Sequence, residues 1–158
     1  MRKEKTAPAS GVLNVNEGPP PELGKPAFAR EIPSDPALVT PLVVRVLEHI
    51  KEEALVETRL ENRVALCLEE ALQNAVVHGN KLQFQKKVQL RIHVEKDAWS
   101  CVVSDEGEGF DPRDVKDPLQ PESIWGEHGR GIYLISHYMD SVEYFDGGST
   151  VVMTKKRK

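Results

Sequence analysis

A stretch of apolar residues at helical spacing, from Leu60 to Val77, constrains the fold of this chain more than any other feature. Apolar side chains recur there every three or four residues, which is the period of one face of an α-helix. They are Leu60, Val64, Cys67, Leu68, Ala71 and Ala75. The pattern predicts a helix with one buried face that ends near Gly79 and Asn80. Such a helix needs a second layer to cover its apolar face.

Alternating side chains predict that the second layer is a β-sheet. Residues 88–94 alternate apolar and polar side chains, and residues 99–103 continue the pattern after a turn at 96–97. Further strands are expected at 28–32, 141–145 and 150–154, and further helices before Glu53 and at 131–138. These elements predict an α+β fold: a two-layer α/β sandwich in which three helices cover a mixed, mostly antiparallel sheet of about five strands.

The chain of 158 residues is long enough for one domain with its own core. Residues 1–26 are rich in proline and glycine and lack apolar periodicity, so we expect a disordered N-terminal arm. Residues 27–158 are expected to form the domain. A long segment with three prolines follows residue 103, and such segments in compact domains are usually lids, binding loops or disordered.

The charge distribution argues against a nucleic-acid partner. Seven of the 21 basic residues lie in the first five and last four positions, so residues 6–154 carry 14 basic and 24 acidic side chains. An acidic core of this kind repels phosphate backbones. No apolar run is long enough to span a membrane, and the N-terminus lacks the apolar segment of a secretory signal. We therefore expect a cytoplasmic protein with no membrane partner, in which Cys67 and Cys101 stay reduced.

The first group of residues that could carry chemistry lies on the predicted long helix. Glu70 and Asn74 are four residues apart, which places both on one helix face, with His78 one further turn along. A carboxylate and a carboxamide on one face can serve as a general base and as an oxygen ligand for Mg²⁺. Taken alone, the spacing is more typical of a solvated helix face with a capping histidine.

Two glycine-rich segments form the other candidate sites. Asp105 directly follows a predicted strand, and Gly107 and Gly109 after it allow close approach of a backbone, although an acidic turn would look the same. Later, Gly129 and Gly131 lead into a predicted helix, where free backbone N–H groups attract phosphate, although a flexible hinge would also use glycines. The pattern GxxxxGK[ST] is absent, which excludes a P-loop.

The order and spacing of these segments resemble the GHKL ATPases. Their N box is similar to EEALQNAVVHGN, their first glycine box to DEGEGFDP, and their second glycine box to GRGIYLISHYMD. The final strand with its Ser/Thr is similar to GGSTVVMTKK. The resemblance extends from about Phe28 to the C-terminus. Within the superfamily, the motif sequences are most similar to those of the anti-sigma factor serine/threonine kinases.

The resemblance implies a role for each matching residue. Asn74 would ligate Mg²⁺, and Glu70 would be the catalytic base. Asp105 would accept a hydrogen bond from the adenine amino group of ATP. Gly107 and Gly109 would let the adenine lie close to the backbone.

The later segments would complete the nucleotide site. Residues 111–128 would form a lid over the nucleotide, and Gly129, Arg130 and Gly131 would meet its phosphates. Arg130 also has the charge to neutralise them. Thr150 would lie near Asp105 and contact the adenine directly or through water.

The function that the resemblance implies is that of an ATP-dependent protein-serine kinase. Such kinases phosphorylate an anti-anti-sigma (STAS-like) protein, bind a sigma factor, and are commonly homodimers. A nucleotide-gated interaction module with little kinase activity remains an alternative, because the sequence shows no partner surface. A detached histidine-kinase domain is a weaker alternative, since His49 is the sole upstream helical histidine and its surroundings, LEHIKEE, do not suit a phosphoacceptor.

Overall fold

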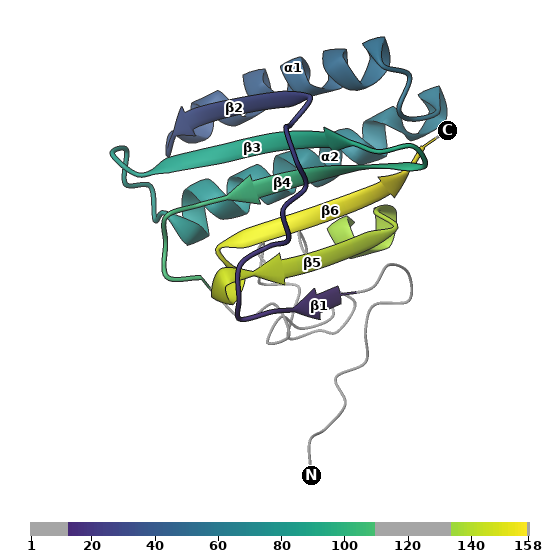
Figure 1. The fold of residues 1–158 in the computed structure, drawn as a ribbon. Helices are drawn as coiled ribbons and strands as arrows, with labels where there is room; N and C mark the ends of the chain where they lie inside the picture. The colour runs from purple at the N-terminus through teal and green to yellow at the C-terminus, as the bar shows by residue number, and fades with distance from the viewer. Residues whose placement is uncertain (1–12, 110–133, 158) are drawn as a thin grey trace, which may run out of the picture.

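The computed structural model describes residues 13–109 and 134–157, which form two layers (Figure 1). One layer is a six-stranded sheet with the strand order β1-β5-β6-β4-β3-β2. The other layer holds the helices, which lie behind the sheet in the view of Figure 1. The strands are β1 (Leu13–Val15), β2 (Phe28–Pro33), β3 (Lys87–Val94), β4 (Ala98–Ser104), β5 (Ser141–Phe145) and β6 (Thr150–Lys156). This arrangement confirms the predicted α+β sandwich.

The sheet is antiparallel except at one edge. β3 and β4 form the predicted hairpin, in which Val94 pairs with Trp99. β6 pairs with β4, so the last strand of the chain lies near the middle of the sheet. The exception is β1, which pairs with β5 in parallel. It belongs to the arm for which we expect disorder, so that expectation is wrong for Leu13–Val15, and the sheet has six strands rather than about five.

Two long helices and one short helical segment cover one face of the sheet. They are α1 (Val39–Glu52), α2 (Glu61–Gln73) and residues 134–138, with short 3₁₀ turns at Pro36–Leu38, Thr58–Leu60 and Asp146–Gly148. α2 does not end at residue 73 but continues as a π-helical turn, η3 (Asn74–Gly79). Within the described parts of the chain, no helix combines the length and apolar character that crossing a bilayer requires.

The core lies between the helices and the sheet. α1 contributes Val46 and Ile50, α2 contributes Leu68 and Leu72, and Trp99 on β4 is fully buried beneath them. The helical spacing that predicts a buried face on α2 is therefore confirmed. A packed layer of this kind fixes the position of α2 over β4 and β6, and with it the position of the polar side chains at the end of α2.

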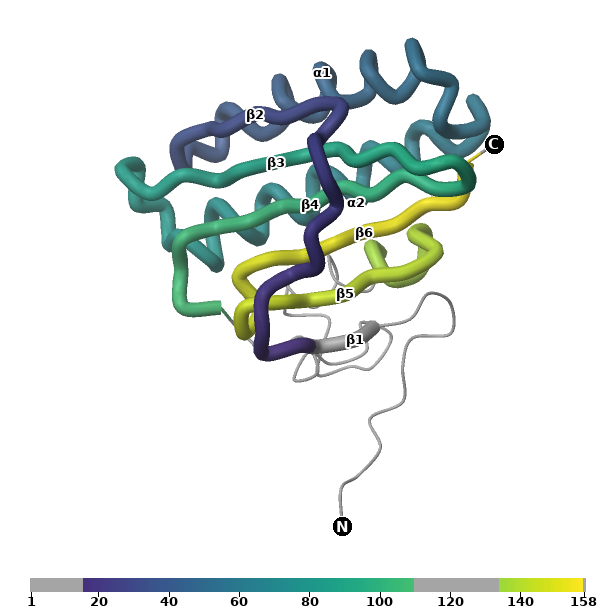
Figure 2. Tube along the Cα trace, in the orientation of Figure 1, coloured from purple at the N-terminus to yellow at the C-terminus, as the bar shows by residue number. Residues whose placement is uncertain are grey.

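Residues 16–27, called the strap below, cross the face of the sheet that the helices leave open (Figure 2). Near its start, the Gly18 carbonyl accepts a hydrogen bond of 2.9 Å from the Asp146 N–H. At its end, the Ala27 N–H donates to the Ile92 carbonyl at 2.8 Å. Between these points Leu23 packs on a small apolar cluster of the outer sheet face, which consists of Val102, Phe145 and Val152.

Candidate functional site

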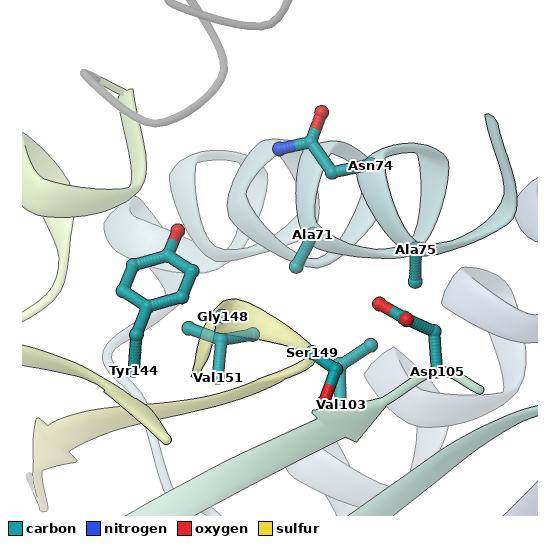
Figure 3. A pocket seen from close by; sticks show the side chains of 9 residues that line it. All are labelled: Ala71, Asn74, Ala75, Val103, Asp105, Tyr144, Gly148, Ser149 and Val151. Atoms are coloured by element: carbon teal, nitrogen blue, oxygen red, sulfur yellow. The ribbon is translucent and has the colours of Figure 1, made fainter. Parts of the chain in front are cut away.

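A small pocket lies between the end of α2 and the adjacent ends of β4 and β6 (Figure 3). Its lining comes from segments that are far apart in the sequence: Ala71, Asn74, Ala75, Val103, Asp105, Tyr144, Gly148, Ser149 and Val151. The volume is about 20 Å³, which is room for about one water molecule. The described residues therefore supply anchoring groups for a ligand rather than its full enclosure.

Asp105 is the charged side chain of this pocket. It follows β4 directly, and Figure 3 shows its carboxylate pointing toward Ala75 across the pocket. Burial raises the pKa of Asp105 to about 6, against smaller opposing effects of the Gly107 N–H and of Lys86. The Gly107 N–H donates to Oδ1 at 2.8 Å, whereas Oδ2 makes no hydrogen bond with the described residues. Oδ2 is thus available to accept a hydrogen bond from an amino group of a ligand.

The glycines beside Asp105 allow two backbone segments to touch. A Cβ on Gly107 would overlap the carbonyl oxygen of Gly79, and a Cβ on Gly79 would overlap the Asp105 carboxylate. Gly109 has a φ of 80°, a conformation that favours glycine, and a Cβ there would meet the Gly147 carbonyl. The turn after β4 therefore lies directly against the π-helical turn, which holds Asp105 in place.

Asn74 and Glu70 lie on α2 and its continuation. Asn74 lines the pocket, is 9% exposed, and carries its carboxamide above the pocket in Figure 3. Glu70 lies one helical turn earlier, is half-buried, and does not line the pocket. His78 is exposed although Asn74 is buried, because the π-helical turn between them changes the helical spacing. Asn74 thus lines the pocket, whereas His78 does not share its buried face as the sequence spacing predicts.

Thr150 does not line the pocket. Its hydroxyl donates to Ser104 Oγ at 3.2 Å and approaches Asp146 Oδ2 at 3.3 Å, on the face of the sheet away from the helices. Ser149, one residue earlier, lines the pocket instead, and its carbonyl accepts from the Asp105 N–H at 2.9 Å. The pairing of Asp105 with Thr150 is therefore wrong by one residue, because a shift of one position along a strand moves a side chain to the opposite face.

The remaining predicted residues fall outside the described part of the chain. These are Gly129, Arg130, Gly131 and the lid at 111–128. The residues that the structure does bring together are Asn74, Asp105, Gly107 and Gly109, from the first two of the three motifs.

Asn80 is a buried residue whose role the sequence does not reveal. Its Nδ2 donates to Ser34 Oγ at 2.8 Å and to the Lys87 carbonyl at 3.0 Å. Its Oδ1 accepts from the Glu106 N–H at 2.8 Å. The side chain is fully buried and joins the end of the π-helical turn to β3 and to the residue after Asp105. These contacts are long-range, and the helix-ending pattern Gly79-Asn80 is the one signal in the sequence.

Asn80→Ala should destabilise the protein by about 2–4 kcal/mol, because it leaves a buried N–H and a buried carbonyl without partners. The free energy of unfolding in urea, followed by circular dichroism, measures the effect. Asn62→Ala is the matched control, since Asn62 is an exposed residue of α2. Equal stability of the two variants would contradict a structural role for the Asn80 contacts.

Comparison of the sequence with known proteins gives one family match and several named relatives. The profile of the family described as "Histidine kinase-like ATPase domain" matches residues 32–155. Serine-protein kinase RsbW of Listeria innocua serovar 6a is 34% identical over 98 residues, which are 57% of this chain and 62% of the relative. The RsbW of Bacillus subtilis strain 168 is 34% identical over 97 residues, 57% of this chain and 61% of the relative. An anti-sigma F factor of Clostridium perfringens is 29% identical over 98 residues, which are 59% of this chain and 70% of the relative. The chain thus spans about six-tenths of the length of the two RsbW relatives.

Proposed function

Because this chain belongs to the histidine kinase-like ATPase domain family, we propose that it binds ATP with Mg²⁺ and phosphorylates a partner protein on serine. The observation that carries the proposal is that Asn74 and Asp105, from two separate motifs, line one pocket. The named relatives include serine-protein kinases and an anti-sigma factor. The proposed partners are therefore a STAS-like anti-anti-sigma protein as the substrate and a sigma factor as the second ligand.

The chemistry of the described residues fits an adenine nucleotide with a hard cation. Asp105 Oδ2 would accept a hydrogen bond from the exocyclic amino group of adenine. Ser149, rather than Thr150 as the sequence predicts, lines the pocket with Asp105. The Asn74 carboxamide oxygen is of the type that Mg²⁺ prefers. When bound, MgATP supplies the phosphoryl group and neutralises part of its charge. Glu70 would accept the proton of the substrate serine.

The other parts of the proposal concern residues beyond the described ranges. Gly129, Arg130 and Gly131 would contact the phosphates, and residues 111–128 would cover them.

A homodimer and a cytoplasmic location also belong to the proposal. The two cysteines suit that location, since both are free and buried, and burial raises the pKa of Cys67 to about 12, which keeps its thiol protonated and unreactive.

Two measurements, made one after the other, test the proposed function. Calorimetry with ATP and with GTP, each with Mg²⁺, should show a clear preference for ATP, because guanine offers a carbonyl where adenine offers the amino group. Incubation with ATP, Mg²⁺ and a STAS-like protein should then add one phosphate to a serine of that protein, detected by mass spectrometry. Nucleotide binding without any phosphate transfer would favour the interaction module, and phosphohistidine on this chain would favour the histidine kinase.

The raised pKa of Asp105 predicts a pH dependence of nucleotide affinity. The folded-state pKa of about 6 lies above the ordinary value of 3.8 for an aspartate, so the ligand-free protein holds this proton more tightly than the unfolded chain does. Stability from this group is present below about pH 4 and is lost as the pH rises through about 6. An amino group favours the ionised carboxylate, so the affinity for ADP should rise over the same range.

Asp105→Asn isolates this effect, since the titration of the phosphates is common to both proteins. The variant should bind ADP about 2 kcal/mol more weakly at pH 8, where a donor replaces an acceptor. The ratio of the two affinities should shrink toward pH 5. A ratio that does not change between pH 5 and pH 8 would show that the ionised Asp105 does not contact the base.

A further inference from the structure

A second groove lies on the opposite side of the sheet from the nucleotide pocket, under the strap. Its volume is about 390 Å³, which is in the range of small-molecule sites. Residues 20–24 of the strap form one wall. Arg91, His93 and Val102, whose side chains lie on the outer face of β3 and β4, form the other. Nothing in the proposed kinase reaction uses this groove.

His93 is buried in the groove without a hydrogen bond. The residue is 3% exposed, and neither Nδ1 nor Nε2 has a hydrogen-bond partner. Burial, and then the neighbouring Arg91, lower the pKa of His93, against smaller opposing effects of the Leu23 backbone and of the Glu95 carboxylate. A buried imidazole without partners is costly. His93 therefore lines the groove with a donor and an acceptor that lie below its surface and that no described residue satisfies.

Arg91 adds a positive charge. Its Nε is buried and has no hydrogen-bond partner, and its guanidinium forms no ion pair with any residue in the described ranges. A guanidinium carries five donors in a fixed plane, a geometry that matches the two oxygens of a carboxylate. The carboxylate that lines the groove is Glu22, which is exposed and forms no ion pair with Arg91 within the described ranges.

We propose that this groove binds a small oxyanion, a carboxylate or a phosphate group, held between Arg91 and His93. Arg91 supplies the charge and a planar set of donors, which match the two oxygens of such a group. His93 supplies a further N–H, and its protonated form is favoured once the anion is present. Val102, Pro20 and Pro21 offer apolar surface to the rest of the ligand. Glu22 opposes binding through its charge at the rim.

The strap makes this site conditional on the N-terminal segment. Its backbone is hydrogen-bonded at Gly18 and Ala27, on either side of the groove wall. A bound anion would contact both the strap and β3, so occupancy should hold the strap more firmly on the sheet. Ligand binding at this site should therefore be coupled to how firmly residues 20–24 are held on the sheet.

The test uses the full chain with inorganic phosphate and with succinate, in chloride-containing buffer at pH 7. Isothermal calorimetry should give saturable binding of at least one of them, with a dissociation constant of about 1 mM or below. The ring nitrogen signals of His93, followed by NMR, should shift on binding, and the pKa of His93 should rise. The two probes distinguish a preference for phosphate from a preference for carboxylate.

Variants locate the binding. Arg91→Gln should weaken binding at least about tenfold, the scale of one charge-assisted hydrogen bond, and Arg91→Lys should weaken it less. Glu22→Gln should tighten it. Arg45→Gln is the matched control, because Arg45 is an exposed residue of α1 on the other layer, and it should bind as the wild type does. Circular dichroism verifies that each variant is folded.

Three results would overturn the proposal. They are the absence of binding of either probe at 20-fold the expected constant, binding that Arg91→Gln leaves unchanged, and binding without any change in the His93 signals. Binding that persists in Arg91→Gln would place the anion elsewhere, for example at the proposed phosphate contacts of the nucleotide site. All three results are independent of kinase activity, so they leave the proposed function untouched.

Discussion

Glu70→Gln is expected to lower the rate of phosphoryl transfer by about 10²–10⁴-fold, the usual contribution of a general base. The carboxamide keeps the shape of the side chain but does not accept a proton. Glu70 is half-buried, one turn before Asn74, and lies outside the pocket that Asp105 lines. The affinity for MgATP should therefore be largely retained. Single-turnover transfer to the STAS-like partner, with calorimetry of MgATP, measures both quantities.

Glu69→Gln is the matched control for this experiment. Glu69 precedes Glu70 on α2, is also half-buried, and points about 100° away around the helix. It should transfer phosphate at the rate of the wild type. Asn74→Ala should behave differently from both, making nucleotide binding insensitive to Mg²⁺. If Glu70→Gln and Asn74→Ala lost magnesium dependence equally, the assignment of base to one and ligand to the other would be wrong.

The parts of the fold that follow from the sequence are those with a strong local period. α2 shows apolar residues on one face along its length, and β3 alternates apolar and polar side chains before a two-residue turn into β4. Periodicity of this kind determines which side of an element is buried, and the buried sides determine how the layers pack. The two motifs, at the ends of α2 and β4, then meet at the pocket because α2 packs on the sheet to which β4 belongs.

The parts that the sequence does not reveal depend on contacts between distant residues. β1 is three residues long, too short to show any alternation, and it is held by pairing with β5. The strap has a composition typical of disorder, yet it lies on the sheet through hydrogen bonds at its two ends. The Asn80 contacts reach Ser34 and Glu106, and no local pattern marks partners so far away.

The exchange of Thr150 for Ser149 has a different cause. A motif match places both residues at the start of the last strand, but the face of each depends on the register of β6 with β4. In that register Ser104 pairs with Thr150, and the two hydroxyls meet on the outer face. The motif therefore locates the strand correctly, whereas the side chain that reaches the pocket follows from the pairing.

Gly107→Ala is expected to damage both stability and nucleotide binding strongly. Its φ is not in the left-handed region, so alanine meets no backbone strain there, and the whole effect comes from the overlap of the new Cβ with the Gly79 carbonyl. Both sides of this contact are backbone, which cannot rotate away. The turn after β4 must then separate from the π-helical turn, at a cost of about 3 kcal/mol in the free energy of unfolding.

The same movement should displace Asp105, since the Gly107 N–H donates to its carboxylate. We therefore expect Gly107→Ala to lose saturable ATP binding even at temperatures where circular dichroism shows it folded. Gly18→Ala is the matched control, because a Cβ at Gly18 has no atom within 4 Å, and it should change stability by no more than about 0.5 kcal/mol. A Gly107→Ala protein with the stability and ATP affinity of the Gly18→Ala control would mean that the close backbone contact does not hold Asp105 in position.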